Sequence, residues 1–188
     1  MAELELSLDA ISHEIILVDD GNGWDENLSL CNLEKEFEYV KILKLDRNHG
    51  QHQATYQGCA MAKGKYIVTM DDDGQHNPEM ILKMQDYLIT SGKDLVYARF
   101  IKIQEDTWRK IVRKLLRNSD KSKSSFRIWT QPINEKLIGS GISNELLDKK
   151  LAKLSPSIGY FDVLHRKSLL KKSRYKFRDY LKYLRQTF

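Results

Sequence analysis

Tyr66-Ile-Val-Thr-Met-Asp-Asp-Asp-Gly-Gln-His-Asn-Pro-Glu79 contains a short apolar run that ends abruptly in three consecutive carboxylates. Such a run predicts a buried strand whose carboxyl end delivers the acids to the edge where open α/β sheets bind ligands. Asp71 and Asp73 can both offer oxygen to one hard divalent cation, which typically bridges protein carboxylates to substrate phosphates. The stretch therefore predicts a divalent-cation site at a strand end.

A second acidic strand end lies upstream, in Glu14-Ile-Ile-Leu-Val-Asp-Asp-Gly21. Two strands that each finish in Asp-Asp indicate a phosphorylated or nucleotide-linked ligand. A purely structural alternative stays open for each of them, because Asp-Gly is a common turn pair and polar residues after a strand often only cap the next helix. We expect Asn77, before Pro78, to act in that way.

The remaining pattern alternates helices with strands. Expected helices cover Leu4–Ile11, Gln51–Ala62 and Pro78–Thr90, and expected strands cover Glu14–Val18, Val40–Leu45, Tyr66–Met70 and Asp94–Ala98. Alternation at this spacing implies right-handed crossovers and a mostly parallel sheet, hence an α/β fold. A length of 188 residues with 41% hydrophobic content suffices for one buried core. The Lys/Ser run at Ser119–Ser125 predicts a mobile loop.

Three segments carry a resemblance to a known family: EIILVDDG (14–21), LDRNHGQHQATYQGCAMAKGKYIVTMDDDGQHNPEMI (45–81) and DLVYARF (94–100). In order and spacing they are similar to family-2 glycosyltransferases of the GT-A fold, above all to the dolichyl- and polyprenyl-phosphate sugar synthases. Asp71-Asp72-Asp73-Gly-Gln75 stands where that family has its Asp-X-Asp metal motif followed by Gln. The resemblance implies transfer of a sugar from a nucleotide-sugar to a polyprenyl phosphate or glycan at the membrane surface.

The same resemblance implies roles for single residues. Mg²⁺ or Mn²⁺ would be held by Asp71 and Asp73, where it would stabilise the leaving nucleotide, and Gln75 would sit beside the metal facing the sugar. At the first acidic strand end, Asp20 would contact the nucleobase with Asp19 supporting it. Two further residues complete the set: Arg47, beside the base or diphosphate, with a surface ion pair to Asp46 as its alternative, and Asp148, at a catalytic acidic position found in some relatives.

Near the C-terminus, VLHRKSLLKKSRYKF (163–177) resembles the family's His…Arg…Gly-Lys-Ser-X-Tyr segment. His165, Lys172, Ser173 and Tyr175 fit that pattern, so the resemblance implies that Lys172, Ser173 and Tyr175 bind substrate. Ser168 and Lys171 replace the usual Arg and Gly.

Charge divides the chain into two halves. Residues 1–100 hold 9 Lys/Arg and 18 Asp/Glu, whereas residues 101–188 hold 22 and 8. We expect the acidic half to bind the nucleotide-sugar and metal, and the basic half of the same domain to face the acceptor and an anionic membrane. Residues 108–117 and 174–188 predict basic amphipathic helices, which lie in a membrane interface or pack on their own domain.

Localisation and partner class follow from what the sequence contains. No apolar run approaches the roughly 20 residues that span a bilayer, and Cys31 and Cys59 show no metal-ligand spacing. We therefore expect a cytoplasmic protein, peripheral at the inner face of the membrane, with reduced core cysteines. No nucleic-acid partner is expected, because the basic half carries none of the usual recognition motifs.

One departure from the family pattern leaves a second function open. Relatives begin with a strand of the type Val-Ile-Pro-X-Tyr-Asn-Glu, whereas this chain starts in what resembles the following helix. We therefore expect the first strand of the GT-A sheet to be missing and residues 1–188 alone to show little or no transfer. The alternative is a truncated, non-catalytic transferase-like domain that binds nucleotide or membrane without turnover.

Overall fold

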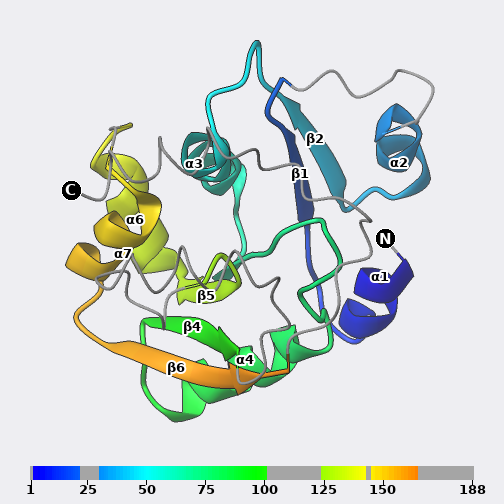
Figure 1. The fold of residues 1–188 in the computed structure, drawn as a ribbon. Coiled ribbons are helices and arrows are strands. Elements are labelled where there is room, and N and C mark those ends of the chain that lie inside the picture. The colour runs from blue at the N-terminus through cyan, green and yellow to red at the C-terminus, as the bar shows by residue number, and fades with distance from the viewer. Residues whose placement is uncertain (1, 22–29, 101–123, 143–144, 165–188) are drawn as a thin grey trace, which may run out of the picture. The chain divides into compact units, whose positions relative to one another are not determined.

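The computed structural model describes residues 2–21, 30–100, 124–142 and 145–164. These residues form two compact units that alternate along the chain. The first takes its described residues from Met1–Ile67 and Trp129–Pro156, and the second takes them from Val68–Ile128 and Ser157–Phe188. Both units mix helices with strands (Figure 1). The two units are defined by their internal packing and not by what they bind. The expected boundary at residue 100, between a donor-binding half and an acceptor-facing half, therefore stays a prediction.

The first unit holds a two-stranded parallel sheet. β1 (Ile15–Asp19) pairs with β2 (Val40–Lys44), in a register that sets Ile15 opposite Val40 and Asp19 opposite Lys44. The helices α1 (Ala2–Leu8) and α2 (Leu30–Glu36) precede the two strands, and α3 (Gln51–Met61) follows them and packs on β1. Both strands lie within one residue of the expected bounds, and their pairing is parallel as the sequence predicts.

Hydrogen bonds join α3 to α6 (Gln131–Gly139), which together with α7 (Leu147–Leu154) completes the first unit. Asn134 is 2% exposed; its Nδ2 donates to the Cys59 carbonyl at 2.9 Å, and its Oδ1 accepts from Trp129 Nε1 at 3.3 Å. Tyr56 donates from its hydroxyl to the Ile138 carbonyl at 2.9 Å. Cys59 is buried, as expected for a core cysteine.

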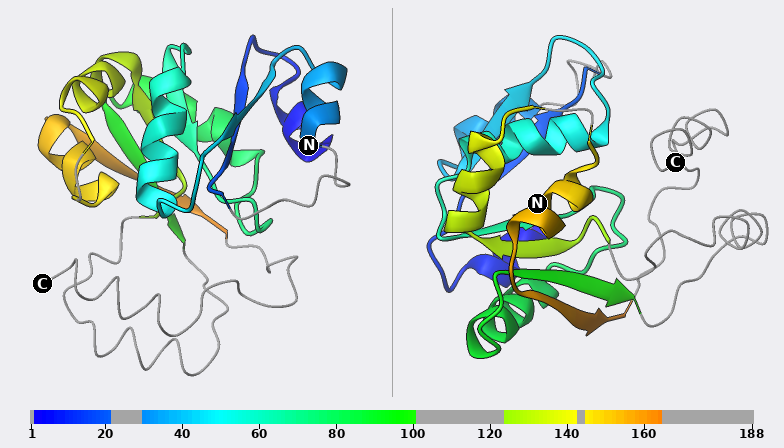
Figure 2. Two further views of the ribbon diagram at one scale, coloured as in Figure 1. Left: turned by 90° about the horizontal axis from the view of Figure 1, so that it is seen from above. Right: turned by 90° about the vertical axis from the view of Figure 1, so that its left-hand side faces the viewer.

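The second unit is built on β4 (Leu95–Phe100) and β6 (Ile158–Val163), which pair in parallel and are covered by α4 (Met80–Thr90) (Figure 2). The first four residues of β4 are at most 1% exposed, as expected for a parallel strand covered on both faces. Arg99 and Asp162 face each other in this register, with Nε 2.5 Å from Oδ1.

Two short strands contribute residues to both units, β3 (Tyr66–Thr69) and β5 (Arg127–Thr130). They complete a four-stranded sheet of order β3-β5-β4-β6. The expected alternation of helices and strands is confirmed, with small shifts of the ends. Thus α4 begins at Met80 rather than Pro78, because Asn77 Oδ1 accepts the Glu79 N–H at 3.2 Å and so holds a turn before the helix.

Two expected elements lie outside the described residues: the basic helix at 108–117 and the C-terminal one at 174–188. In the part of the chain that the structure describes, no helix combines the length and apolar character needed to cross a bilayer.

Candidate functional site

The three carboxylates after β3 lie in a tight turn of the second unit. Asp73 Oδ1 accepts the Gln75 N–H at 3.0 Å, and Gly74 between them has a φ of 76°. Glycine suits this position because the left-handed region strains other residues. Asp72 is exposed, whereas Asp71 and Asp73 are half-buried. The turn expected of Asp-Gly is therefore present, and it fixes the carboxylate of Asp73 by a backbone hydrogen bond.

Two residues that the sequence analysis did not single out hold Asp71. Ser125 Oγ donates to Asp71 Oδ2 at 2.7 Å, and His76 Nδ1 accepts the backbone N–H of Asp71 at 2.9 Å. The second ring nitrogen of His76, Nε2, lies 3.9 Å from Asp71 Oδ2. The only sequence feature that points to such a contact is the presence of a histidine five residues after Asp71, and this spacing alone is a weak indication.

The donor set of this turn fits a magnesium-like cation. Asp71 and Asp73 supply hard carboxylate oxygens, and each oxygen can accept more than one partner. Within residues 2–21, 30–100, 124–142 and 145–164, no group of three or more His, Cys, Asp or Glu side chains is placed so that it could hold a metal ion by itself. Two carboxylates are too few to surround a cation with protein ligands alone. They suit a cation such as Mg²⁺, which completes its coordination with substrate phosphates and water.

The other acidic strand end, in the first unit, anchors a loop. Asp20 Oδ1 accepts the N–H of His49 at 2.7 Å, and its Oδ2 accepts the N–H of Gly50 at 2.8 Å. Gly21 has a φ of 65°, and a Cβ there would lie 2.4 Å from the backbone carbonyl carbon of Arg47. Asp19, at the end of β1, is buried. The Asp-Asp-Gly sequence thus binds the loop 46–50 that leads into α3.

Arg47 lies at the surface of this loop. Its side chain is 78% exposed, and its Nε is 3.9 Å from Asp46 Oδ2, so the ion pair weighed as the alternative is present. Exposed pairs of this kind contribute little to stability. Asp46 also accepts from His49 Nε2 at 2.7 Å, and this hydrogen bond lowers the pKa of the Asp46 carboxyl. The ion pair leaves the guanidinium largely in solvent, where a ligand can reach it.

The structure groups the remaining expected residues only in part. Asp71, Asp73 and Gln75 share one turn of the second unit, while Asp19, Asp20 and Arg47 share one strand end and its loop in the first. Asp148 lies in the first turn of α7, also in the first unit. His165, Lys172, Ser173 and Tyr175 lie outside the described residues.

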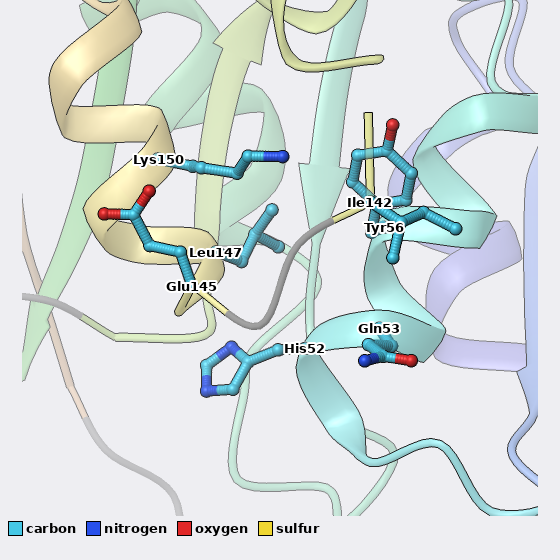
Figure 3. Close-up of a pocket in the computed structure, with 7 residues that line it drawn as sticks. All are labelled: His52, Gln53, Tyr56, Ile142, Glu145, Leu147 and Lys150. Carbon is cyan, nitrogen blue, oxygen red and sulfur yellow. The ribbon is translucent and has the colours of Figure 1, made fainter. Parts of the chain in front are cut away.

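A small hollow between α3 and α7 contains none of the expected site residues (Figure 3). Its lining comprises His52, Gln53, Tyr56, Ile142, Glu145, Leu147 and Lys150. The buried Lys150 donates to the Gly141 carbonyl, and its Nζ lies 5.2 Å from the centre of the Tyr56 ring. Because this cation is engaged at the end of α6, the hollow is part of the packing of the first unit.

A family model matches most of the chain. The model described as glycosyl transferase family 2 matches residues 6–153, which include both acidic strand ends. The chain belongs to glycosyl transferase family 2. The match covers the segments 14–21, 45–81 and 94–100 and ends within α7, whereas the resemblance at 163–177 lies outside it.

Curated relatives of this family-2 chain match a little over half of it. The undecaprenyl-phosphate 4-deoxy-4-formamido-L-arabinose transferase of Pectobacterium atrosepticum is 35% identical over 105 residues, 55% of this chain and 32% of the relative. The protein of the same name from Aeromonas hydrophila is 34% identical over 110 residues, 57% of this chain and 33% of the relative. The family-2 chain thus spans about a third of the length of these relatives.

Solved structures show the fold of the family-2 chain to be GT-A. A crystal structure of S. aureus TarS aligns with a TM-score of 0.59 at 13% identity, over 87% of this chain and 33% of that one. Glucosyl-3-phosphoglycerate synthase from Mycobacterium tuberculosis, solved with Mn²⁺, UDP-glucose and glycerol 3-phosphate, aligns with a TM-score of 0.51 at 15% identity, over 96% and 70% of the two chains. The α/β expectation is therefore confirmed at the level of the fold.

Proposed function

We propose that this chain forms the donor-binding part of a glycosyltransferase that moves a sugar from a nucleotide-sugar to a polyprenyl phosphate. The observation that carries the proposal is the acidic turn after β3, where Asp71 and Asp73 are fixed by hydrogen bonds within the region matched to family 2. The names of the curated relatives support undecaprenyl phosphate as the acceptor. A TarS fragment solved with UDP-GlcNAc supports a UDP-sugar as the donor.

The mechanism assigns binding and orientation to the residues of the chain. Asp71 and Asp73 would hold Mg²⁺ or Mn²⁺, which supplies charge stabilisation to the leaving diphosphate when bound. Gln75 would orient the donor sugar, and the exposed guanidinium of Arg47 would bind the base or diphosphate. A polyprenyl phosphate is already anionic at neutral pH, so it needs a strong general base less than a sugar hydroxyl does. Asp148 is retained as the candidate acid or base for a glycan acceptor.

Asp20, which directly follows β1, would help donor binding by holding the loop 46–50. Asp20, with Asp19 supporting it, stays the proposed contact of the nucleobase. Both oxygens of Asp20 already accept backbone N–H groups, so a base would have to share them. The more direct role of Asp20 is to fix the loop that carries Arg47.

The acceptor side rests on the sequence. Lys172, Ser173 and Tyr175 are the proposed contacts of the acceptor phosphate, and the excess of Lys and Arg after residue 100 favours an anionic membrane surface at the cytoplasmic face. Vesicles test this part. We expect the protein to sediment with anionic vesicles and to be released as salt screens the contacts. Equal sedimentation with neutral vesicles would contradict it.

A transfer assay tests the proposal as a whole. Undecaprenyl phosphate and a panel of radiolabelled UDP-sugars are incubated with the wild type and with Asp73→Asn in the presence of Mn²⁺. We expect at most a low level of lipid-linked label from residues 1–188 alone, and loss of that label in D73N. Asp72→Asn is the matched control, because Asp72 is the exposed middle acid of the same turn. Nucleotide binding without label in any arm would favour the non-catalytic alternative.

A further inference from the structure

The contact between His76 and Asp71 fixes the protonation of the histidine ring. A backbone N–H can only donate, so Nδ1 of His76, 2.9 Å from the Asp71 nitrogen, must carry a lone pair. In the neutral ring the proton then resides on Nε2, the nitrogen that lies 3.9 Å from Asp71 Oδ2. The imidazole of His76 therefore accepts a hydrogen bond from the backbone of Asp71 and lies close to its carboxylate.

The ring is held in this orientation by the core of the second unit. His76 is 5% exposed. It stacks on Phe126 with centroids 5.1 Å apart and planes at 16°, and on Phe100 at 5.6 Å and 11°. A ring stacked on two phenyl groups has little freedom to rotate, so the acceptor nitrogen stays aimed at the turn. A residue serving only as apolar filling would not need to be a histidine.

We infer that His76 is a positioning residue for cation binding: it fixes the backbone of Asp71 so that the carboxylate meets the cation in one geometry. This inference rests on the proposed function, because it presupposes a cation at Asp71 and Asp73. Residues that hold metal ligands by hydrogen bonds typically change metal affinity by about 10- to 100-fold when replaced. The alternative is that His76 only packs in the core. In that case the ring would stabilise the fold, and the hydrogen bond that Nδ1 accepts would not affect cation binding.

Two substitutions separate these roles. In His76→Asn the amide oxygen can occupy the place of Nδ1 and accept the Asp71 N–H, while the stacked ring is lost. In His76→Phe the ring is kept between Phe100 and Phe126, while the acceptor is lost. The readout is the affinity for Mn²⁺ in the presence of UDP, from the electron paramagnetic resonance signal of free Mn²⁺, with thermal unfolding measured for each variant.

Positioning predicts that H76F binds Mn²⁺ about tenfold or more weakly than the wild type, while H76N stays closer to the wild type. H76F binding as tightly as the wild type would overturn the inference, and so would equal losses in the two variants. The Asp71 amide gives a second readout that needs neither ligand nor substitution. Its hydrogen exchange in the wild type should be slow, and exchange at the rate of an open turn would also overturn the inference.

Failure of the proposed function remains distinguishable from failure of this inference. D73N measured beside the wild type reports whether the turn binds Mn²⁺ at all. A wild type without Mn²⁺ affinity would remove the proposed function, whereas equal affinities of the wild type and H76F, with D73N weakened, would remove only the role of His76.

Discussion

Ser125 Oγ donates a hydrogen bond of 2.7 Å to Asp71 Oδ2, although the two residues are 54 positions apart in the chain. The segment before β5 is itself tied to the end of β3, because Thr69 Oγ1 donates to the Ser125 carbonyl at 2.7 Å. The hydroxyl of Ser125 is thus delivered to the first acid of the turn by strand packing. Cation binding at Asp71 should therefore depend on a residue far away in sequence.

Replacement of Ser125 tests this dependence. Ser125→Ala removes the hydroxyl that donates to Asp71 Oδ2. It leaves in place the hydrogen bond from Thr69 Oγ1 to the backbone carbonyl of residue 125. We expect the affinity for Mn²⁺ with UDP to fall about tenfold, as is typical when a partner of a metal ligand is lost. Ser124→Ala is the matched control, because Ser124 donates to the Phe126 carbonyl instead. Equal affinities in the two variants would disprove the role of the Ser125 hydroxyl.

Asp20 should control the loop that carries Arg47. In Asp20→Asn one of the two acceptor oxygens becomes an NH₂ group that faces a backbone donor, so the N–H of His49 or Gly50 loses its partner. Because a hydrogen bond to a charged group contributes about 1.5 kcal/mol or more, hydrogen exchange of these amides should accelerate by about tenfold.

The control for this exchange measurement is Asp46→Asn. Asp46 is an exposed acid of the same loop that accepts from the His49 side chain. We expect the amides of His49 and Gly50 to exchange in D46N as in the wild type. Acceleration in D46N equal to that in D20N would mean that general loss of charge, and not the Asp20 anchor, governs the loop.

Gly21 should tolerate no side chain. An alanine Cβ there would lie 2.4 Å from the Arg47 carbonyl carbon and 2.8 Å from the Asn48 nitrogen, in addition to the strain of a φ of 65°. Gly141 in the same unit has a φ of 73° with open space around it, so Gly141→Ala isolates the strain.

We expect urea unfolding to show a loss of about 1 kcal/mol for G141A, and a loss larger by about 1–3 kcal/mol for G21A, because the clash with backbone adds an overpacking cost. Similar losses in the two variants would show that Gly21 does not lie against the backbone of the Arg47 loop.

Glu14 should stabilise the first unit in a pH-dependent manner. Its Oε2 accepts from Lys41 Nζ at 2.7 Å and its Oε1 accepts the Lys63 N–H at 2.6 Å. Partial burial acts to raise the pKa of the Glu14 carboxyl, but the hydrogen bonds from Lys41 and Lys63 outweigh it, and the net pKa lies below its ordinary value.

A lowered pKa means that the folded state binds the proton less tightly than the unfolded state does. The stabilisation is then present above the ordinary pKa of about 4.3, and it is lost as the pH falls through the lower folded value. Glu14→Gln should reduce the free energy of unfolding by roughly 1 kcal/mol at pH 7, and by less as the pH falls below about 4. Glu38→Gln, at an exposed acid beside β2, is the matched control and should change the free energy of unfolding at pH 7 by less than about 0.5 kcal/mol. A pH-independent difference between E14Q and the wild type would contradict this prediction.

The local parts of the fold were predictable because the signal lies within each segment. The apolar run before Asp71 predicts the strand found as β3, and the run at Asp94–Ala98 predicts the strand found as β4. Parallel pairing followed from the alternation with helices, and the pairs β1–β2 and β4–β6 confirm it.

Contacts between distant segments were not predictable in the same way. Ser125 falls at the end of the run Ser119–Ser125 that the sequence predicts as a mobile loop, and only its hydrogen bond to Asp71 reveals its part in the site. The N–H groups that Asp20 accepts belong to the backbone, which has no sequence signature. The sequence does not reveal the role of His76, because the role of a single buried histidine depends on the partners that the fold brings to it.

If Asp71 and Asp73 bind a cation that carries the nucleotide diphosphate, calorimetric titration of UDP should show that UDP binding depends on the cation. Without a cation, the charge of the diphosphate meets the carboxylates across a low-dielectric site and is repelled. We predict measurable UDP binding in Mn²⁺, no binding in EDTA, and loss of the difference in Asp73→Asn. Equal affinity of the wild type for UDP in Mn²⁺ and in EDTA would contradict the account.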